Sequence, residues 1–157
     1  MPFLKVGKTA PDFSLHNQHN EIIRLKDFKG KNNILVYFYP KAATPGCTTQ
    51  ACGMRDYDAE LKQLNTIVLA ISPDAPGKLH KFDTKYNLKF NLLSDEDHAV
   101  ADSYGVWGLK KFMGREFMGI IRTSFIIGMD GKLMNVLEKV NTKTHHDDVI
   151  NYIKNHT

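Results

Sequence analysis

The chain has two cysteines, Cys47 and Cys52, and both lie in the segment KAATPGCTTQACG. Thr44 is a residue type that often caps a helix N-terminus, and Pro45 suits the first helical position because its missing N–H would be unpaired there. Cys47 then falls in the first turn, beside unpaired N–H groups and the positive end of the helix dipole. Both features stabilise a thiolate, the nucleophilic form of cysteine. The segment therefore predicts a reactive thiol at Cys47; the alternative is a small buried apolar residue at a helix start.

The spacing of the two cysteines limits what they can do together. Residues five apart in an α-helix have Cα atoms roughly 8–9 Å apart, whereas a disulfide needs Cα atoms about 4.4–6.8 Å apart. A bond between Cys47 and Cys52 would therefore require the helix start to unwind, so we do not expect a permanent disulfide. A metal site is not expected either, because His145 and His146 lie over ninety residues away. What remains is a redox pair in which one thiol is oxidised and the other traps the product.

The composition is that of an ordinary globular protein. The 157 residues are 42% hydrophobic and 24% charged, with a formal net charge of +4, and we expect one domain over residues 1–157. The lysines are scattered, and the pair Lys110-Lys111 is too short for a nucleic-acid patch. The apolar run at 34–40 is far shorter than a membrane span, and the first residues lack the pattern of a secretory signal. We therefore expect a cytoplasmic protein that binds neither nucleic acid nor membrane.

Hydrophobic periodicity predicts alternating strands and helices. A continuously apolar stretch at 34–39 reads as a central strand covered on both faces. Asp130-Gly131 is a favoured tight-turn pair between two strand-like segments, which predicts a hairpin. The predicted strands lie near 13–15 and at 21–25, 34–39, 66–71, 91–93, 123–128 and 132–137, and the predicted helices at about 45–64, 76–86, 97–104 and 144–155. This order favours an α/β fold, a thioredoxin-like three-layer sandwich with a central mixed β-sheet flanked by helices.

The segment YFYPKAATPGCTTQACGMRD also resembles a known family. Pro40, Thr44 and Cys47 form the P-x-x-x-T-x-x-C pattern of the peroxiredoxins, and Cys52 stands where the bacterioferritin comigratory protein (PrxQ) branch has its resolving cysteine. The resemblance continues through APDFSL, LLSDEDH, YGVWG and RTSFIIGMDGK, and so spans nearly the whole chain.

The resemblance implies a thiol peroxidase acting on hydrogen peroxide and organic hydroperoxides, monomeric and without a cofactor or metal. Cys47 would attack the peroxide and become a sulfenic acid, and Cys52 would resolve it as a disulfide that thioredoxin reduces. Thr44 would cap the helix and position the peroxide with its hydroxyl, and Pro40 would shield the thiolate from water. Arg122 would lie against Cys47 and stabilise negative charge; from the residues alone it is no more distinguished than any other arginine.

The chain departs from the resembled pattern at few positions. Many relatives have a polar or acidic residue where this chain has Ala42-Ala43, and Glu where it has Gln50. Trp107 and Phe112 are candidates for lining the pocket, although aromatic residues are more often part of a core. Two other functions remain open from the residues alone: a thiol–disulfide oxidoreductase acting on proteins, and a non-catalytic binding or holdase role. Loss of Cys47 would leave a holdase role intact.

Overall fold

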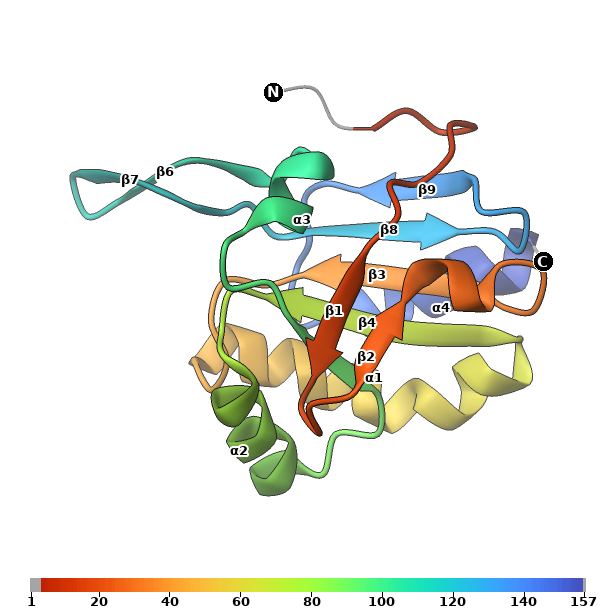
Figure 1. The fold of residues 1–157 in the computed structure, drawn as a ribbon, viewed down its shortest axis with the longest axis horizontal. Coiled ribbons are helices and arrows are strands. Elements are labelled where there is room, and N and C mark those ends of the chain that lie inside the picture. Colours follow the sequence, from red (N-terminus) through yellow and green to blue (C-terminus); the bar gives the residue numbers. More distant parts are fainter. Residues whose placement is uncertain (1–3, 157) are drawn as a thin grey trace.

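The computed structural model describes residues 4–156, whose centre is a seven-stranded mixed sheet in the order β2-β1-β5-β4-β3-β8-β9 (Figure 1). Strands β3, β4 and β5 are parallel to one another, whereas β1 and β8 pair antiparallel with β5 and β3. The elements in chain order are β1 (Ser14–Asn17), β2 (Ile22–Arg24), the 3₁₀ turn η1 (Leu25–Phe28), β3 (Asn33–Phe38), α1 (Pro45–Gln63), β4 (Thr66–Ser72), α2 (Pro76–Tyr86), β5 (Asn91–Ser94), α3 (Ala99–Ser103), β6 (Trp107–Phe112), β7 (Arg115–Ile120), β8 (Thr123–Ile127), β9 (Leu133–Leu137) and α4 (His145–His156).

The central strand β3 separates two apolar layers. All six of its residues are buried, and because successive side chains of a strand point to opposite faces, they contribute alternately to the two layers. Leu35 and Tyr37 join a cluster with α1, α2 and α4, and Val36 and Phe38 join a second cluster on the other face. A strand apolar on both faces belongs in the middle of a covered sheet, which explains its position between β4 and β8.

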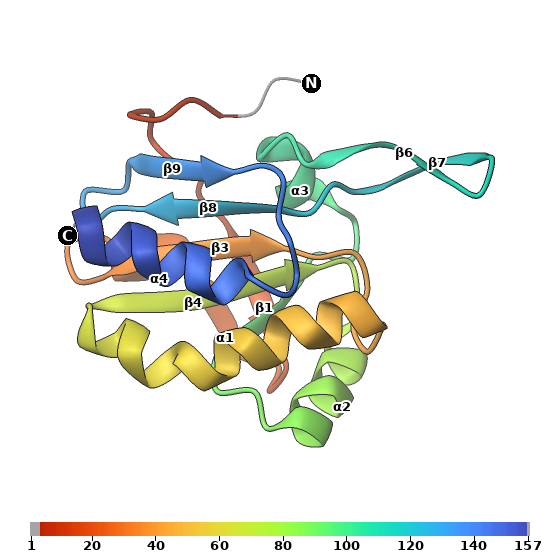
Figure 2. The ribbon, with the colours of Figure 1, turned by 180° about the vertical axis from the view of Figure 1, so that it is seen from behind.

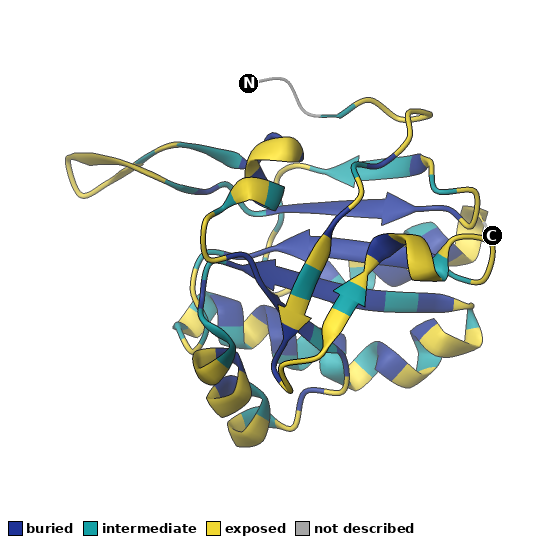
Figure 3. Cartoon of the chain, viewed as in Figure 1, coloured by how far each residue is buried: buried dark blue, intermediate teal, exposed yellow. Residues whose placement is uncertain are grey.

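The two faces are covered by different elements. Figure 2 shows α1 and α4 lying side by side across one face, where they pack against each other. The opposite face carries α3 and η1, and the β1–β2 end of the sheet folds in front of the central strands on that side (Figure 1). Burial follows this layering: the central strands are buried and the outer surfaces of the helices are exposed (Figure 3). The fold is therefore the α/β thioredoxin-like sandwich with a mixed sheet that the sequence predicts.

Most predicted elements are present within a few residues of their expected bounds. The helix expected at 76–86 is Pro76–Tyr86, and the Asp130-Gly131 hairpin joins β8 to β9, with Gly131 at a φ of +81°. A second hairpin, formed by β6 and β7, was not predicted. None of the described helices is long and apolar enough to cross a membrane.

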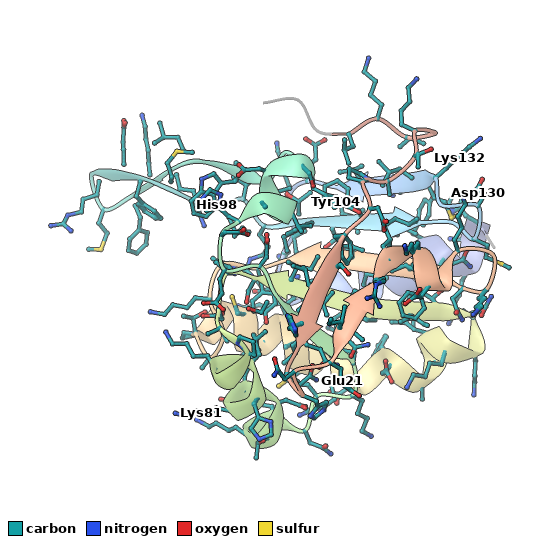
Figure 4. All side chains as sticks on the ribbon, in the orientation of Figure 1. Glu21, Lys81, His98, Tyr104, Asp130 and Lys132 are labelled. Carbon is teal, nitrogen blue, oxygen red and sulfur yellow. The ribbon has the colours of Figure 1, made fainter. Side chains whose placement is uncertain are left out.

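The β6–β7 hairpin projects from the body of the molecule, as Figure 4 shows, with His98 at its base. Its two-residue turn places Met113 at a φ of +51° and Gly114 at +78°. Five of the eight exposed large hydrophobic side chains among the described residues belong to it: Leu109, Phe112, Met113, Phe117 and Met118. Because apolar and charged side chains lie on both faces of this ribbon, it lacks the strict alternation by which a half-buried strand is predicted.

Candidate active site

The start of α1 is held by the loop that connects it to β3. The Ala42 N–H donates to Oδ2 of the buried Asp74 (2.7 Å), which also accepts the Ser72 hydroxyl (2.9 Å). The next residue, Ala43, has a φ of +66°, a left-handed conformation that is unfavourable for a residue with a Cβ. The loop thus keeps a strained turn immediately before the helix because a buried carboxylate anchors it.

Thr44 is the N-cap residue of α1, as predicted, but its side chain makes no capping hydrogen bond. Its hydroxyl instead donates to the Lys41 carbonyl oxygen at 2.7 Å. The helix is capped by backbone geometry: Thr44 is extended and its carbonyl accepts the first helical hydrogen bond, from Thr48 N–H at 2.9 Å. With its one proton donated to Lys41, the Thr44 oxygen is left as an acceptor.

Cys47 lies in the first turn of α1 and is 2% exposed. Nη2 of Arg122 donates to its Sγ at 3.3 Å. The sheet explains why residues 75 positions apart meet. Phe38, the last residue of β3, pairs antiparallel with Thr123, the first residue of β8, so Arg122 stands at the edge where β3 leads into the loop before α1. The thiol therefore lies between the positively polarised N-terminus of a helix and a guanidinium.

A continuous set of side-chain hydrogen bonds extends behind Arg122. Its Nη1 donates to Oε1 of Gln50 at 2.6 Å, Gln50 Nε2 lies 3.3 Å from Nδ1 of His145, and His145 Nε2 lies 2.7 Å from Ser124 Oγ. Gln50, Ser124 and His145 are each at most 1% exposed. Burial, with smaller contributions from the nearby His146 and Arg122, lowers the pKa of His145 to about 3, so the imidazole is neutral at physiological pH.

Cys52 lies one and a half turns beyond Cys47 in the same unbroken helix and is half-buried. Both are free thiols. A continuous helix holds residues at this spacing too far apart for a disulfide. Any bond between the two sulfurs therefore requires α1 to unwind at its N-terminal end, as the sequence predicts.

The comparisons with known proteins identify the family. The AhpC/TSA family model matches residues 6–136. The chain therefore belongs to the AhpC/TSA family. It is 54% identical to peroxiredoxin Bcp of Escherichia coli over 153 residues, covering 98% of this chain and 97% of that protein. It is 42% identical to peroxiredoxin Bcp of Bacillus subtilis over 151 residues, covering 96% of each chain.

Solved structures agree with this assignment. The peroxidoxin BcpB of Mycobacterium tuberculosis superposes with a TM-score of 0.86 at 31% identity, covering 98% of this chain and 99% of that one. A PrxQ mutant of Xylella fastidiosa superposes with a TM-score of 0.93 at 26% identity, covering 99% of both chains. This peroxiredoxin is thus of the Bcp/PrxQ type, and its enzyme class is that of a peroxidase.

The remaining candidate residues of this peroxiredoxin lie around the loop and the hairpin. Pro40 is half-buried and lies two residues past the end of β3. Trp107, at the base of the hairpin, stacks on His98 with ring centroids 3.9 Å apart. Phe112 is 66% exposed next to the hairpin turn and so is not part of an enclosed pocket. Lys110 is partly buried, and this burial lowers its pKa, with the positive charge of Arg122 adding to the effect.

Two residues of the site were not assigned a role from the sequence. Gln50 stood out only as a departure from the resembled pattern, and His145 was considered only as a metal ligand and rejected. No feature of the neighbouring sequence marks either residue as part of the site. Gln50 lies inside a helix, and His145 begins a helix at the far end of the chain. In the described part of the chain, no group of three or more His, Cys, Asp or Glu side chains is placed to hold a metal ion.

Proposed function

We propose that this peroxiredoxin reduces hydrogen peroxide and organic hydroperoxides through Cys47 and is returned to its reduced state by thioredoxin. The observation that carries the proposal is the 3.3 Å hydrogen bond from Arg122 Nη2 to Cys47 Sγ at the start of α1. This contact favours a thiolate in a nearly buried position. It also leaves a positive charge beside the sulfur, where negative charge develops during peroxide cleavage.

In the first step the Cys47 thiolate attacks the terminal oxygen of R–O–OH. The sulfur–oxygen bond forms as the O–O bond breaks, and the leaving RO⁻ takes a proton to give an alcohol, or water when the substrate is hydrogen peroxide. Thr44 Oγ1, which already donates its own proton to Lys41, accepts the hydrogen bond of the peroxide hydroxyl. Arg122 stabilises the charge on the departing oxygen, and Pro40 limits the access of bulk water. Cys47 becomes a sulfenic acid.

In the second step the Cys52 thiol attacks the sulfenic sulfur of Cys47. The sulfur–sulfur bond forms, the hydroxyl leaves as water, and α1 unwinds locally so that the sulfurs can meet. The third step is thiol–disulfide exchange, in which the two thiols of thioredoxin reduce this disulfide and become a disulfide themselves. Cys52 is well placed for this cycle because it is half-exposed while Cys47 is buried.

The two cysteine variants test the cycle. Cys47→Ser should abolish peroxide consumption with every reductant. Cys52→Ser should consume about one peroxide per chain and then stop when thioredoxin is the only reductant. Peroxide and reductant consumption are measured in steady state, and sulfenic acid is trapped with a dimedone probe. Undiminished turnover in Cys47→Ser would contradict the proposal. Reduction of insulin without peroxide would instead indicate a protein disulfide reductase.

We also propose that the protein acts as a monomer in the reducing environment of the cytoplasm. Both cysteines being free thiols is consistent with such an environment, and the site is assembled from residues of one chain. Light scattering of the reduced and oxidised forms over a range of concentrations tests the monomer. A stable dimer in the reduced form would contradict it.

A further inference from the structure

The hydrogen bonds that link Arg122, Gln50, His145 and Ser124 permit only one assignment of donors and acceptors. A guanidinium can only donate, so the Gln50 atom at 2.6 Å from Arg122 Nη1 must be the carbonyl oxygen Oε1. The amide nitrogen of Gln50 therefore faces His145, and because that nitrogen only donates, His145 Nδ1 must accept. The ring proton is then on Nε2, from which it is donated to Ser124 Oγ at 2.7 Å.

We infer that His145 is a positioning residue for peroxide reduction: as a neutral Nε2–H imidazole, it holds the Gln50 carbonyl toward Arg122 and so keeps the guanidinium on Cys47. The inference rests on the proposed role of Cys47 and Arg122. His145 touches neither Cys47 nor the peroxide and acts only through Gln50 and Arg122. The resemblance to peroxiredoxins assigns it no role.

The alternative states of His145 disrupt the chain. A protonated ring, or a neutral ring with its proton on Nδ1, presents an N–H to the Gln50 amide N–H₂. Either the Gln50 amide flips, which turns its N–H₂ group toward the Arg122 guanidinium, or the amide keeps its orientation and loses its hydrogen bond to His145. An unpaired buried donor is costly, so the network stabilises one tautomer and one amide orientation.

The surroundings of His145 favour this neutral state from every side. The ring packs against Tyr37 of β3, with ring centroids 5.2 Å apart. The titratable and charged groups that face the His145 ring are Tyr37, Arg122 and the adjacent His146. None of them is an acid that would hold a proton on the ring at neutral pH, because burial raises the pKa of Tyr37 well above its usual value. Ser124 Oγ lies 2.7 Å from Nε2 and accepts its hydrogen bond.

The first test replaces the ring while keeping an aromatic side chain. His145→Phe should lower the second-order rate constant of Cys47 oxidation by hydrogen peroxide about tenfold, the effect of losing a well-formed hydrogen bond. The single tryptophan, Trp107, reports the oxidation in single-turnover stopped flow. His146→Phe is the matched control, because His146 packs against Tyr57 with ring centroids 4.8 Å apart and lies outside the chain of hydrogen bonds. It should react at the normal rate.

The second test detects coupling that a purely structural role would not show. Gln50→Glu gives His145 a carboxylate partner, which favours the imidazolium. The pH profile of Cys47 oxidation should then gain an inflection near neutral pH, and the double variant with His145→Phe should lose it. Ring-nitrogen NMR should show neutral His145 with its proton on Nε2 in the natural protein, and a titrating His145 in Gln50→Glu.

Several outcomes would overturn the inference. These are a natural oxidation rate in folded His145→Phe, the same pH profile in Gln50→Glu as in the natural protein, or a proton on Nδ1 in the NMR spectrum. Should His145→Phe fail to fold, the NMR and Gln50→Glu measurements decide alone. Failure of the proposed function is recognised separately, because Cys47→Ser would then retain peroxide turnover whatever stands at His145.

Discussion

Replacing Arg122 with methionine removes the positive charge beside the reactive thiol while keeping a side chain of similar length. In the structure this guanidinium donates to Cys47 Sγ at 3.3 Å and to Gln50 Oε1 at 2.6 Å. The variant therefore removes two hydrogen bonds and a charge from the site. We expect it to slow peroxide reduction strongly and to leave the fold intact, because residue 122 is half-buried immediately before β8 rather than inside the core.

The size of the effect follows from the distance and the burial. Two unit charges 3.3 Å apart interact by about 5 kcal/mol at an effective dielectric constant of about 20, and by about 1.3 kcal/mol in bulk water. Cys47 is buried and Arg122 half-buried, so the relevant value lies between these limits. A loss of about 3 kcal/mol corresponds to roughly a hundredfold lower rate constant. This agrees with the effect of removing one donor that stabilises a developing oxyanion, about 10²–10³-fold.

The assay is single-turnover oxidation of the reduced protein by hydrogen peroxide, followed by stopped-flow fluorescence. Arg115→Met is the matched control, because Arg115 carries the same charge at the exposed end of the β6–β7 hairpin. It should react at the natural rate. Arg122→Lys should recover part of the lost rate, since one ammonium cannot reproduce the two-pronged contact of a guanidinium. A folded Arg122→Met protein that reacts within about twofold of Arg115→Met would refute the electrostatic argument.

Three further predictions concern dynamics and stability. Oxidation to the Cys47–Cys52 disulfide should increase amide exchange across 44–55, measured by mass spectrometry, because α1 has to unwind there; equal protection in both redox forms would contradict this. Ala43→Gly should raise the free energy of unfolding by about 0.5–1 kcal/mol in urea denaturation, since it relieves a left-handed residue with φ of +66°; a less stable variant would show that the loop is unstrained. The pKa of His145, about 3 instead of 6.5, means that only the unfolded chain is protonated there between about pH 6 and 4. Its contribution to stability is therefore present above pH 6.5 and is lost as the pH falls, by about 1.4 kcal/mol per pH unit. Urea denaturation at several pH values should show this slope in the natural protein and not in His145→Phe.

The elements that could be predicted from the sequence are those that are buried against a neighbouring layer. The strand at 33–38 and the helix Pro76–Tyr86 were predictable because apolar periodicity reflects burial against a neighbouring layer. The β6–β7 hairpin was missed because it projects from the body, so its apolar and charged side chains follow no buried face. Strand propensity without such a face is a weak signal.

The same division runs through the active site. The residues between Thr44 and Cys52 were sufficient to predict a helix start, a reactive thiol in its first turn, and a second thiol that cannot reach it while the helix stands. These properties depend on helix geometry and backbone capping, which act over a few residues and are therefore encoded locally.

The sequence alone could not determine the surroundings of the thiol. The three residues come from different elements: Arg122 from the position just before a strand, Gln50 from inside one helix and His145 from the beginning of another. Only the antiparallel pairing of β3 with β8 and the packing of α4 against α1 bring them together. Tertiary structure likewise decides the direction of each hydrogen bond and the tautomer of His145. It also decides that the Thr44 hydroxyl makes no capping hydrogen bond. A hydrogen bond depends on distance and angle between groups, and no residue type carries that information by itself.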